Sequence, residues 1–181
     1  MLTLRSSPAE GVVLKRSNVG EADRIVTVLT KEHGKIAGVA KGVRKVTSSK
    51  KSYLEPGNHV RIFLIKTKSM PIITQASLLH QAIDGPATLR QYRSLVQWLE
   101  IINAVFVEEE LTDELYKLVL ATRLQCLAQP VNVTRLQKQL ALILEQLGFN
   151  EPQGEKAYSI TQFVNTIADH PLNGFDYLSV R

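Results

Sequence analysis

The feature that most limits the fold is a pair of strand-like runs in the first third of the chain. The runs Arg24–Thr30 and Lys35–Lys41 are extended in character, and the four residues Lys31–Gly34 join them. The glycine that ends this link can adopt the positive φ angle that a hairpin loop requires. The sequence therefore predicts a β-hairpin at this position.

Side-chain parity along the second run predicts which residues face the core. Successive side chains of a strand point to opposite faces, so Ile36, Gly38 and Ala40 share one face, while Lys35 and Lys41 share the other. If Ile36 and Ala40 fill the core, the two lysines stand outside, about 20 Å apart. Gly38 is predicted to form a bulge or bend that helps a small barrel to close.

The hairpin leads into a basic, Ser/Thr-rich stretch, KGVRKVTSSKKS, which is predicted to be a surface loop over residues 41–52. It carries five Lys/Arg and no acidic residue, and almost none of it is suited to a core. A solvated charge run is the alternative, but these cations continue one face of the strand, which favours polyanion binding. The candidate DNA-binding residues are Lys35, Lys41, Arg44, Lys45, Lys50 and Lys51.

The composition of the first 80 residues favours phosphate contacts over base stacking. Only two aromatic residues occur there, Tyr53 and Phe63. Binding should then show little sequence preference and a strong dependence on salt concentration. If about five phosphates of a single strand are paired, log K should fall with log salt at a slope near −3.5.

Five short strands separated by turns are expected within residues 1–80, at Glu10–Arg16, Arg24–Thr30, Lys35–Lys41, His59–Lys66 and Ile72–Ala76. This number and spacing are typical of a small antiparallel barrel, and an oligonucleotide/oligosaccharide-binding (OB) fold is the leading candidate. The predicted class is α+β, with an OB domain over residues 1–80 and an all-α domain over residues 81–181.

Beyond His80 the apolar period changes to the three- and four-residue steps of helices. Thr88, Thr112 and Ser159 are expected N-caps, and either Asn132 or Thr134 caps the third helix. That third helix is expected to end at a left-handed Gly148. The inward residues expected for the first helix are Leu89, Tyr92, Leu95, Val96, Leu99, Ile102, Val105 and Phe106.

Charge is distributed unevenly along the 181 residues. The first 80 carry 14 Lys/Arg against 5 Asp/Glu, a net charge of +9, and residues 81–181 carry 8 against 12, a net of −4. The asymmetry predicts a nucleic-acid-facing module followed by one with another task. No apolar run has the length of a membrane span, and the single Cys126 forms no intramolecular disulfide, so we expect a cytoplasmic protein.

No pattern in the chain predicts catalysis, a metal or a cofactor. There is no Walker or GxGxxG motif, and the four histidines, at 33, 59, 80 and 170, lack the spacing of metal ligands. The acidic run Glu108–Glu110 is explained by helix ends and solubility. Cys126 lies on the apolar side of its helix and is expected to be a buried, inert thiol.

Several segments resemble the RecO family of bacterial recombination mediators. The specific match is Gly20–Ile36 with Val39–Arg44, and Leu54–Gly57 is similar to the family's turn before the fourth strand. Leu142–Phe149 looks like its helix that ends in leucine-glycine-aromatic. The resemblance covers residues 10 to about 150.

The resemblance implies an OB barrel, a helical domain and a non-enzymatic role in recombinational repair, with binding and annealing of single- and double-stranded DNA. It implies contacts with the acidic tail of single-stranded DNA-binding protein and with RecR, and indirect help in loading RecA. Lys35 and Lys41 match the family's DNA-binding strand, and Arg44 with Lys45 begins its basic loop. The positions that match its tail-binding cations are Arg135 and Lys138, beside a groove expected at Leu136 and Leu140.

Two departures and two alternatives accompany this interpretation. The four-cysteine zinc module of many relatives is absent, and the chain is shorter than the family pattern after residue 150. One alternative is a ribosome-associated, RNA-binding OB module, which competition between DNA and RNA would reveal. The other is a metal-dependent nuclease or phosphatase that uses the acidic run. A RecO-like protein is expected to be cytoplasmic and associated with the nucleoid.

Overall fold

The computed structural model describes residues 6–45, 48, 50–149, 159–168 and 172. The predicted polar linker at residues 151–156 and His170 lie outside these described residues. The chain divides into two compact units. The first consists of residues 1–82 together with residues 106–111, and the second of residues 83–105 and 112–181.

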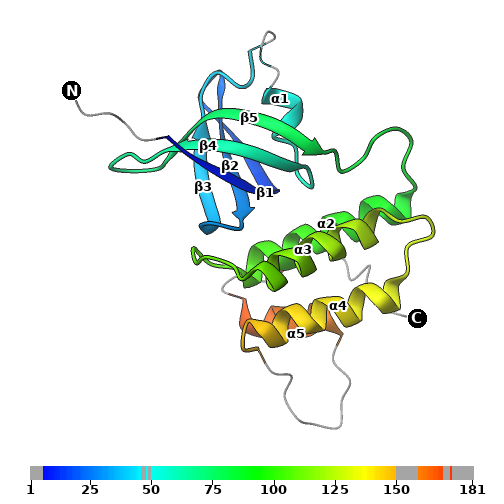
Figure 1. The fold of residues 1–181 in the computed structure, drawn as a ribbon. Helices are drawn as coiled ribbons and strands as arrows, with labels where there is room; N and C mark the ends of the chain where they lie inside the picture. Colours follow the sequence, from blue (N-terminus) through cyan, green and yellow to red (C-terminus); the bar gives the residue numbers. More distant parts are fainter. Residues whose placement is uncertain (1–5, 46–47, 49, 150–158, 169–171, 173–181) are drawn as a thin grey trace. The chain divides into compact units, whose positions relative to one another are not determined.

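The first unit is a closed five-stranded barrel (Figure 1). Around the barrel the strands follow the order β1-β2-β3-β5-β4, and each neighbouring pair is antiparallel except the parallel pair β3 and β5. This is the predicted OB fold. Its strands are β1 (Ser6–Val19), β2 (Asp23–Thr30), β3 (Gly34–Ala40), β4 (His59–Ile65) and β5 (Ile72–His80).

Strand β1 is twice as long as predicted, because it pairs with two neighbours. Its first part, Ser6–Val12, pairs with β4, and its second part, Gly11–Val19, pairs with β2. Strand β5 is also longer than predicted, since its pairing with β4 continues to His80. The longer β1 thus pairs with both β2 and β4, and the barrel closes on its other side where Val39 of β3 pairs with Ile72 of β5.

The predicted hairpin is confirmed as β2 and β3. Their register is unbroken from Arg24 opposite Ala40 to Thr30 opposite Gly34, and Gly34 has a φ of +62°. The hydroxyl of Thr30 donates to the Gly34 carbonyl at 3.1 Å and accepts from the His33 amide at 3.1 Å. One buried side chain therefore satisfies two backbone groups of the turn.

The parity prediction for β3 is confirmed. Ile36 and Ala40 are buried in the barrel core, and Lys35 is partly exposed. Gly38 forms no bulge, because the register of β2 and β3 passes through it without a shift. A Cβ at Gly38 would lie 3.0 Å from the side chain of Ile73, so the glycine instead leaves room for β5 to approach.

A segment between two helices, Phe106–Leu111, belongs to the barrel unit. The Lys35 amide donates to the Val107 carbonyl at 2.8 Å, and the Leu111 amide donates to the Lys31 carbonyl at 3.0 Å. A side chain on Gly34 would collide with the backbone of this segment. The segment thus lies against the turn between β2 and β3, which the sequence pattern did not predict.

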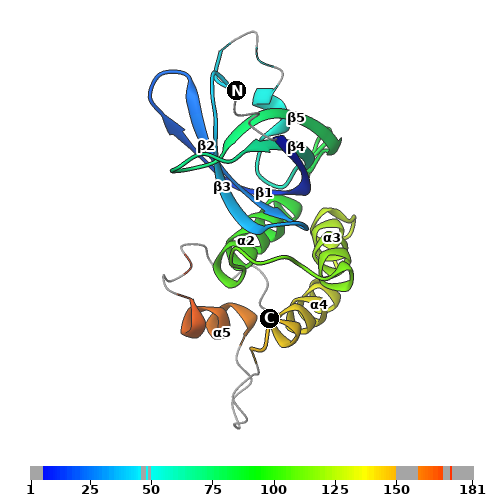
Figure 2. The same ribbon diagram turned by 60° about the vertical axis from the view of Figure 1, so that its left-hand side comes forward.

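Five helices complete the described fold, and Figure 1 labels them while Figure 2 shows the same ribbon turned. A single turn, α1, ends the basic stretch that was predicted to be a loop throughout. In the second unit α3 packs against both α2 and α4, and α5 also contacts these two helices. The helices are α1 (Lys50–Tyr53), α2 (Leu89–Val105), α3 (Asp113–Leu127), α4 (Val133–Gln146) and α5 (Ile160–Ile167).

The predicted helix ends are confirmed. The Thr88 hydroxyl accepts from the Gln91 amide at 3.3 Å, and the Gln91 side chain accepts from the Thr88 amide at 2.8 Å. This reciprocal pair is a capping box. The structure selects Asn132 over Thr134 as the cap of α4, and Gly148 ends that helix with a φ of +83°. The other two caps are Thr112 and Ser159.

The predicted inward face of α2 is partly wrong. Three of its members are 63%, 48% and 48% exposed: Leu89, Tyr92 and Val96. Gln91 and Gln97 are buried instead, and the side-chain NH₂ group of each donates to a neighbouring helix. Gln91 donates to the Leu127 carbonyl at 2.6 Å, and Gln97 donates to the Thr161 hydroxyl at 2.5 Å. Among the described helices none is long and apolar enough to cross a bilayer.

Candidate nucleic-acid interface

The basic segment, defined as Lys41–Ser52, connects β3 to the turn before β4. Apolar residues hold it at each end, since Val43 and the nearby Leu54 are both fully buried in the barrel core. Gly42, the second residue of the segment, has a φ of +64°. Val43 is thus the exception to the expectation that almost none of this segment is suited to a core. Residues 46, 47 and 49 of the segment lie outside the described part.

The structure brings five of the six candidate cations together in this segment. Lys41, Arg44, Lys45 and Lys51 are exposed, and Lys50 is partly exposed. The Lys50 ammonium donates to the Thr74 carbonyl at 3.2 Å, and the Arg44 guanidinium donates to the Gly20 carbonyl at 3.0 Å. Carbonyls neutralise no charge, so both groups remain cationic. The side chains of Lys41, Lys45 and Lys51 make no hydrogen bond or ion pair with any other described residue.

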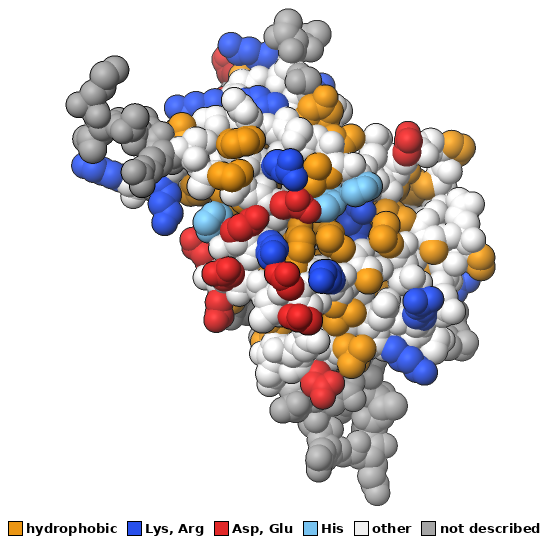
Figure 3. All heavy atoms as spheres, in the orientation of Figure 1, with side chains coloured by type: hydrophobic (Ala, Val, Ile, Leu, Met, Phe, Trp, Pro, Cys, Tyr) orange, Lys and Arg blue, Asp and Glu red, His pale blue; other side chains and the backbone are white. Residues whose placement is uncertain are grey.

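Lys35 lies apart from the other candidates, at the opposite end of β3. It is partly exposed and adjoins the segment Phe106–Leu111, which carries the three exposed carboxylates of Glu108–Glu110. Figure 3 shows Asp and Glu side chains in red on the face that it displays. Because carboxylates repel phosphates, Lys35 has a less favourable setting for a polyanion than the basic segment has.

Sequence reasoning missed the role of Arg24. This arginine is only 5% exposed, and its guanidinium pairs with Glu55 at 3.1 Å and donates to the Asn18 side chain at 3.2 Å. It therefore does not add to the exposed cations of the barrel. The sequence offers Glu55, beside the turn at Pro56 and Gly57, as a possible partner. Arg24 and Glu55 are 31 residues apart, however, and no rule of sequence spacing predicts that they pair.

Two histidines that the sequence presents as isolated are in fact neighbours. His59 and His80 are opposite each other on β4 and β5, and their Nδ1 atoms lie 3.1 Å apart. The Nε2 atom of His59 lies 3.0 Å from a carboxylate oxygen of Glu10. Within the described residues no three His, Cys, Asp or Glu side chains are grouped to hold a metal ion.

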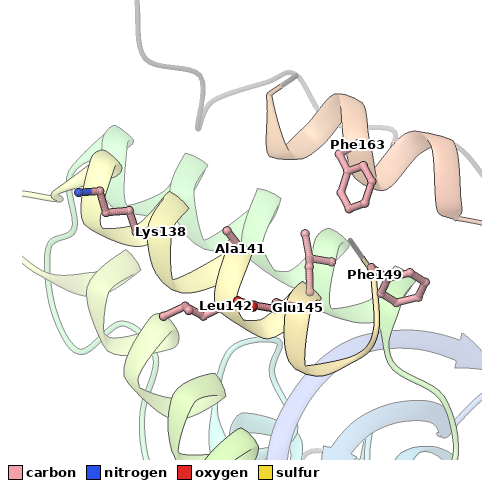
Figure 4. Close-up of a pocket in the computed structure, with 7 residues that line it drawn as sticks. Lys138, Ala141, Leu142, Glu145, Phe149 and Phe163 are labelled. Carbon is pink, nitrogen blue, oxygen red and sulfur yellow. The ribbon is translucent and has the colours of Figure 1, made fainter. Parts of the chain in front are cut away.

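The second unit has an apolar cavity of about 500 Å³ between α4, α5 and Phe149, which lies three residues beyond the end of α4 (Figure 4). Lys138 lies at its margin, and Arg135 is exposed one turn earlier on α4. Leu136 and Leu140 are 0% and 1% exposed, so the groove expected beside them is wrong. They face the helical core, and an accessible apolar surface near them is the cavity lined by Lys138, Ala141, Leu142, Leu144, Glu145, Phe149 and Phe163.

The strand order and the helical unit together define the class of protein. It is an OB-barrel protein with an appended helical unit and a strongly basic segment between its third and fourth strands. Residues 5–82 match the family model described as Recombination protein O N terminal.

Relatives agree with the family model. The DNA repair protein RecO of Frankia casuarinae is 39% identical over 105 residues, which cover 55% of this chain and 42% of the relative. That of Cutibacterium acnes is 37% identical over 125 residues, covering 66% and 49%. One from Bifidobacterium longum is 49% identical over 67 residues, covering 37% and 28%. The chain is thus similar to RecO proteins, over residues 5–82 for the family model and over 125 residues for the relative from Cutibacterium acnes. The matched regions cover less than half of the length of each of these relatives.

Proposed function

We propose that this protein is a non-enzymatic, DNA-binding recombination mediator. It binds single- and double-stranded DNA, anneals complementary strands and helps to load RecA onto DNA covered by single-stranded DNA-binding protein. The observation that carries the proposal is the cluster of five cations in the basic segment of an OB barrel. The relatives bear the name DNA repair protein, which favours DNA over the RNA-binding alternative.

The mechanism follows from the charges. Lysine and arginine side chains that meet phosphates release condensed counterions, and this release drives binding without reading base edges. A surface that screens one phosphate chain also lowers its repulsion for a second chain, so two complementary strands can pair beside it. Annealing of this kind requires no covalent chemistry, and the protein would act at the nucleoid.

A double charge reversal tests the DNA-binding surface. We expect Lys41→Glu with Lys45→Glu to weaken binding of labelled oligo(dT) on the order of a hundredfold at about 50 mM salt, because two phosphate contacts become repulsions. Fluorescence anisotropy measures the affinity. The control, Arg90→Glu with Lys117→Glu, changes the net charge equally at exposed residues of α2 and α3. Equal losses in the two double variants would contradict the assignment.

We further propose that the second unit receives the acidic C-terminal tail of single-stranded DNA-binding protein. The apolar cavity suits the hydrophobic end of such a tail, while Arg135 and Lys138 suit its carboxylates. Glu145 also lines the cavity and opposes anions there, so the tail's acidic part is expected nearer to Lys138. RecR is proposed as a further partner, and RecA as one reached indirectly.

Peptide binding tests this docking site. Arg135→Glu with Lys138→Glu should weaken binding of an acidic tail peptide about tenfold, since two charge-assisted contacts are lost. Isothermal titration calorimetry measures the affinity, and Arg90→Glu with Lys117→Glu again matches the change of net charge. Tail binding that survives in the first variant as well as in the control would place the site elsewhere.

A further inference from the structure

We infer that Asp23, Arg24 and Glu55 are positioning residues that hold the basic segment in the arrangement that meets a phosphate chain. The inference rests on the proposed function and extends it to residues that contact no DNA themselves. All three lie outside the segment, and two of them are acidic, so a count of favourable charges would assign them no part in binding a polyanion.

The buried guanidinium of Arg24 joins strand β2 to the far end of the segment. Its Nη1 atom donates to a Glu55 oxygen at 3.1 Å and lies 3.5 Å from the Lys51 carbonyl. Its Nε atom donates to the Asn18 side chain at 3.2 Å. A buried arginine is stable only when its charge is paired and its donors are used, so this arrangement resists displacement.

The carboxylate of Glu55 forms ion pairs with two arginines, Arg16 and Arg24. Its other oxygen lies 2.7 Å from the Nε atom of Arg16 in β1. The carboxylate therefore ties Glu55, two residues beyond the end of α1, to two adjacent strands of the barrel. Asn58 adds to this end, because its side-chain amide donates to the carbonyls of Ser52 and Tyr53, each at 3.0 Å.

The turn between β1 and β2 holds the near end of the segment. A carboxylate oxygen of Asp23 accepts from the Gly42 amide at 2.7 Å. The Ala22 carbonyl accepts from the Arg44 amide at 2.9 Å, and the Gly20 carbonyl accepts from the Arg44 guanidinium at 3.0 Å. Gly20, Ala22, Asp23 and Arg24 thus supply partners to the two ends of the basic segment, whereas Glu21 contacts neither end.

The cations in and around the basic segment fall into two groups, those paired within the protein and those exposed to solvent. Arg16 and Arg24 are engaged within the protein, whereas Lys41, Lys45 and Lys51 are exposed. When the ends of the segment are held in place, less conformational entropy is lost as a phosphate chain binds. Substituting a positioning residue should therefore change the affinity for DNA, although it leaves the number of exposed cations unchanged.

Two single variants, each lacking one acidic side chain, distinguish an effect of positioning on DNA affinity from an effect of net charge. Glu55→Ala and Glu21→Ala each delete one negative charge, and Glu21 is exposed in the turn between β1 and β2, without a hydrogen-bond or ion-pair partner among the described residues. Charge alone predicts equal or tighter binding of oligo(dT) by both. Positioning predicts that Glu55→Ala binds about tenfold more weakly, while Glu21→Ala does not weaken.

The salt dependence distinguishes a loss of positioning from a loss of phosphate contacts. Because Glu55→Ala keeps every exposed cation, its slope of log K against log salt should stay within about 0.7, the value of one phosphate, of the slope of the unmodified chain. Circular dichroism confirms that each variant is folded. Asp23→Ala leaves the Arg24–Glu55 pair intact but removes the hydrogen bond to the Gly42 amide. It should therefore also weaken binding, because the near end of the segment is no longer held.

The outcomes distinguish the two levels of the proposal. If the unmodified chain binds oligo(dT) and folded Glu55→Ala binds as well as Glu21→Ala, the inference is overturned while the proposed function stands. If Glu55→Ala fails to fold, undiminished binding by Asp23→Ala overturns the inference in the same way. If the unmodified chain binds no oligonucleotide, the proposed function falls and the inference falls with it.

Discussion

Cys126 shows how its surroundings set the chemistry of a single residue. It is fully buried in α3, and burial raises the pKa of its thiol well above the usual range. The thiolate is the reactive form, so the native thiol should be inert. We expect no reaction with a thiol reagent at neutral pH in the folded protein and complete reaction in denaturant. Rapid labelling of the folded protein would contradict this description.

The same burial predicts a pH dependence of stability. The thiol is neutral in the folded state but ionises in the unfolded chain above a pH of about 8.5. The folded pKa is the higher one, so the contribution of Cys126 is complete below that pH and is lost as the pH rises. The free energy of unfolding should fall more steeply above about pH 8.5 than it does in Cys126→Ala, as urea denaturation can measure. Parallel pH profiles would contradict the shift.

Trp98 depends on one buried hydrogen-bond partner. Its indole N–H donates to the Thr122 hydroxyl at 2.8 Å, and both side chains are fully buried. Thr122→Val should cost about 1 to 3 kcal/mol, because it leaves a buried donor unsatisfied. In a Trp98→Phe background the same change should cost about 1 kcal/mol less, since that donor is absent. Urea denaturation followed by circular dichroism measures both, and additive costs would contradict the coupling.

At the scale of elements, the turn between β2 and β3 depends on Gly34. Gly20 and Gly34 both have φ angles near +60°, but only Gly34 adjoins the backbone of Val107 and Glu109. Gly20→Ala should therefore cost about 1 to 2 kcal/mol from its backbone conformation alone. Gly34→Ala should cost about 1 to 3 kcal/mol more, because the new methyl group must displace that backbone. Thermal unfolding compares them, and equal costs would show that the segment yields without penalty.

The elements themselves could be predicted because their signals are local. The glycine of Lys31–Gly34 and the capping residues Thr112 and Asn132 act within a few residues of their position, and the structure confirms all of them. The buried face of α2 could not be predicted in the same way. Gln91 is buried because a carbonyl of another helix satisfies its amide, and no periodicity in its own helix contains that information.

At the scale of the whole molecule, the sequence predicts which residues are cationic but not which cations are used inside the protein. Arg24 and Lys41 are both basic residues, so the sequence alone does not distinguish them. In the structure Arg24 is paired with Glu55, whereas Lys41 is exposed. Long-range pairing decides between them. The same limit explains why Lys35 was grouped with the basic segment, although it adjoins the acidic segment Phe106–Leu111.

The central claim is that cations of the basic segment bind phosphate chains electrostatically, and the salt dependence of affinity tests it most directly. Binding of labelled oligo(dT) by the full chain should be measured from about 50 to 200 mM salt. If about five phosphates are paired, the slope of log K against log salt should lie near −3.5. A slope close to zero would contradict the claim, because binding without counterion release is not electrostatic.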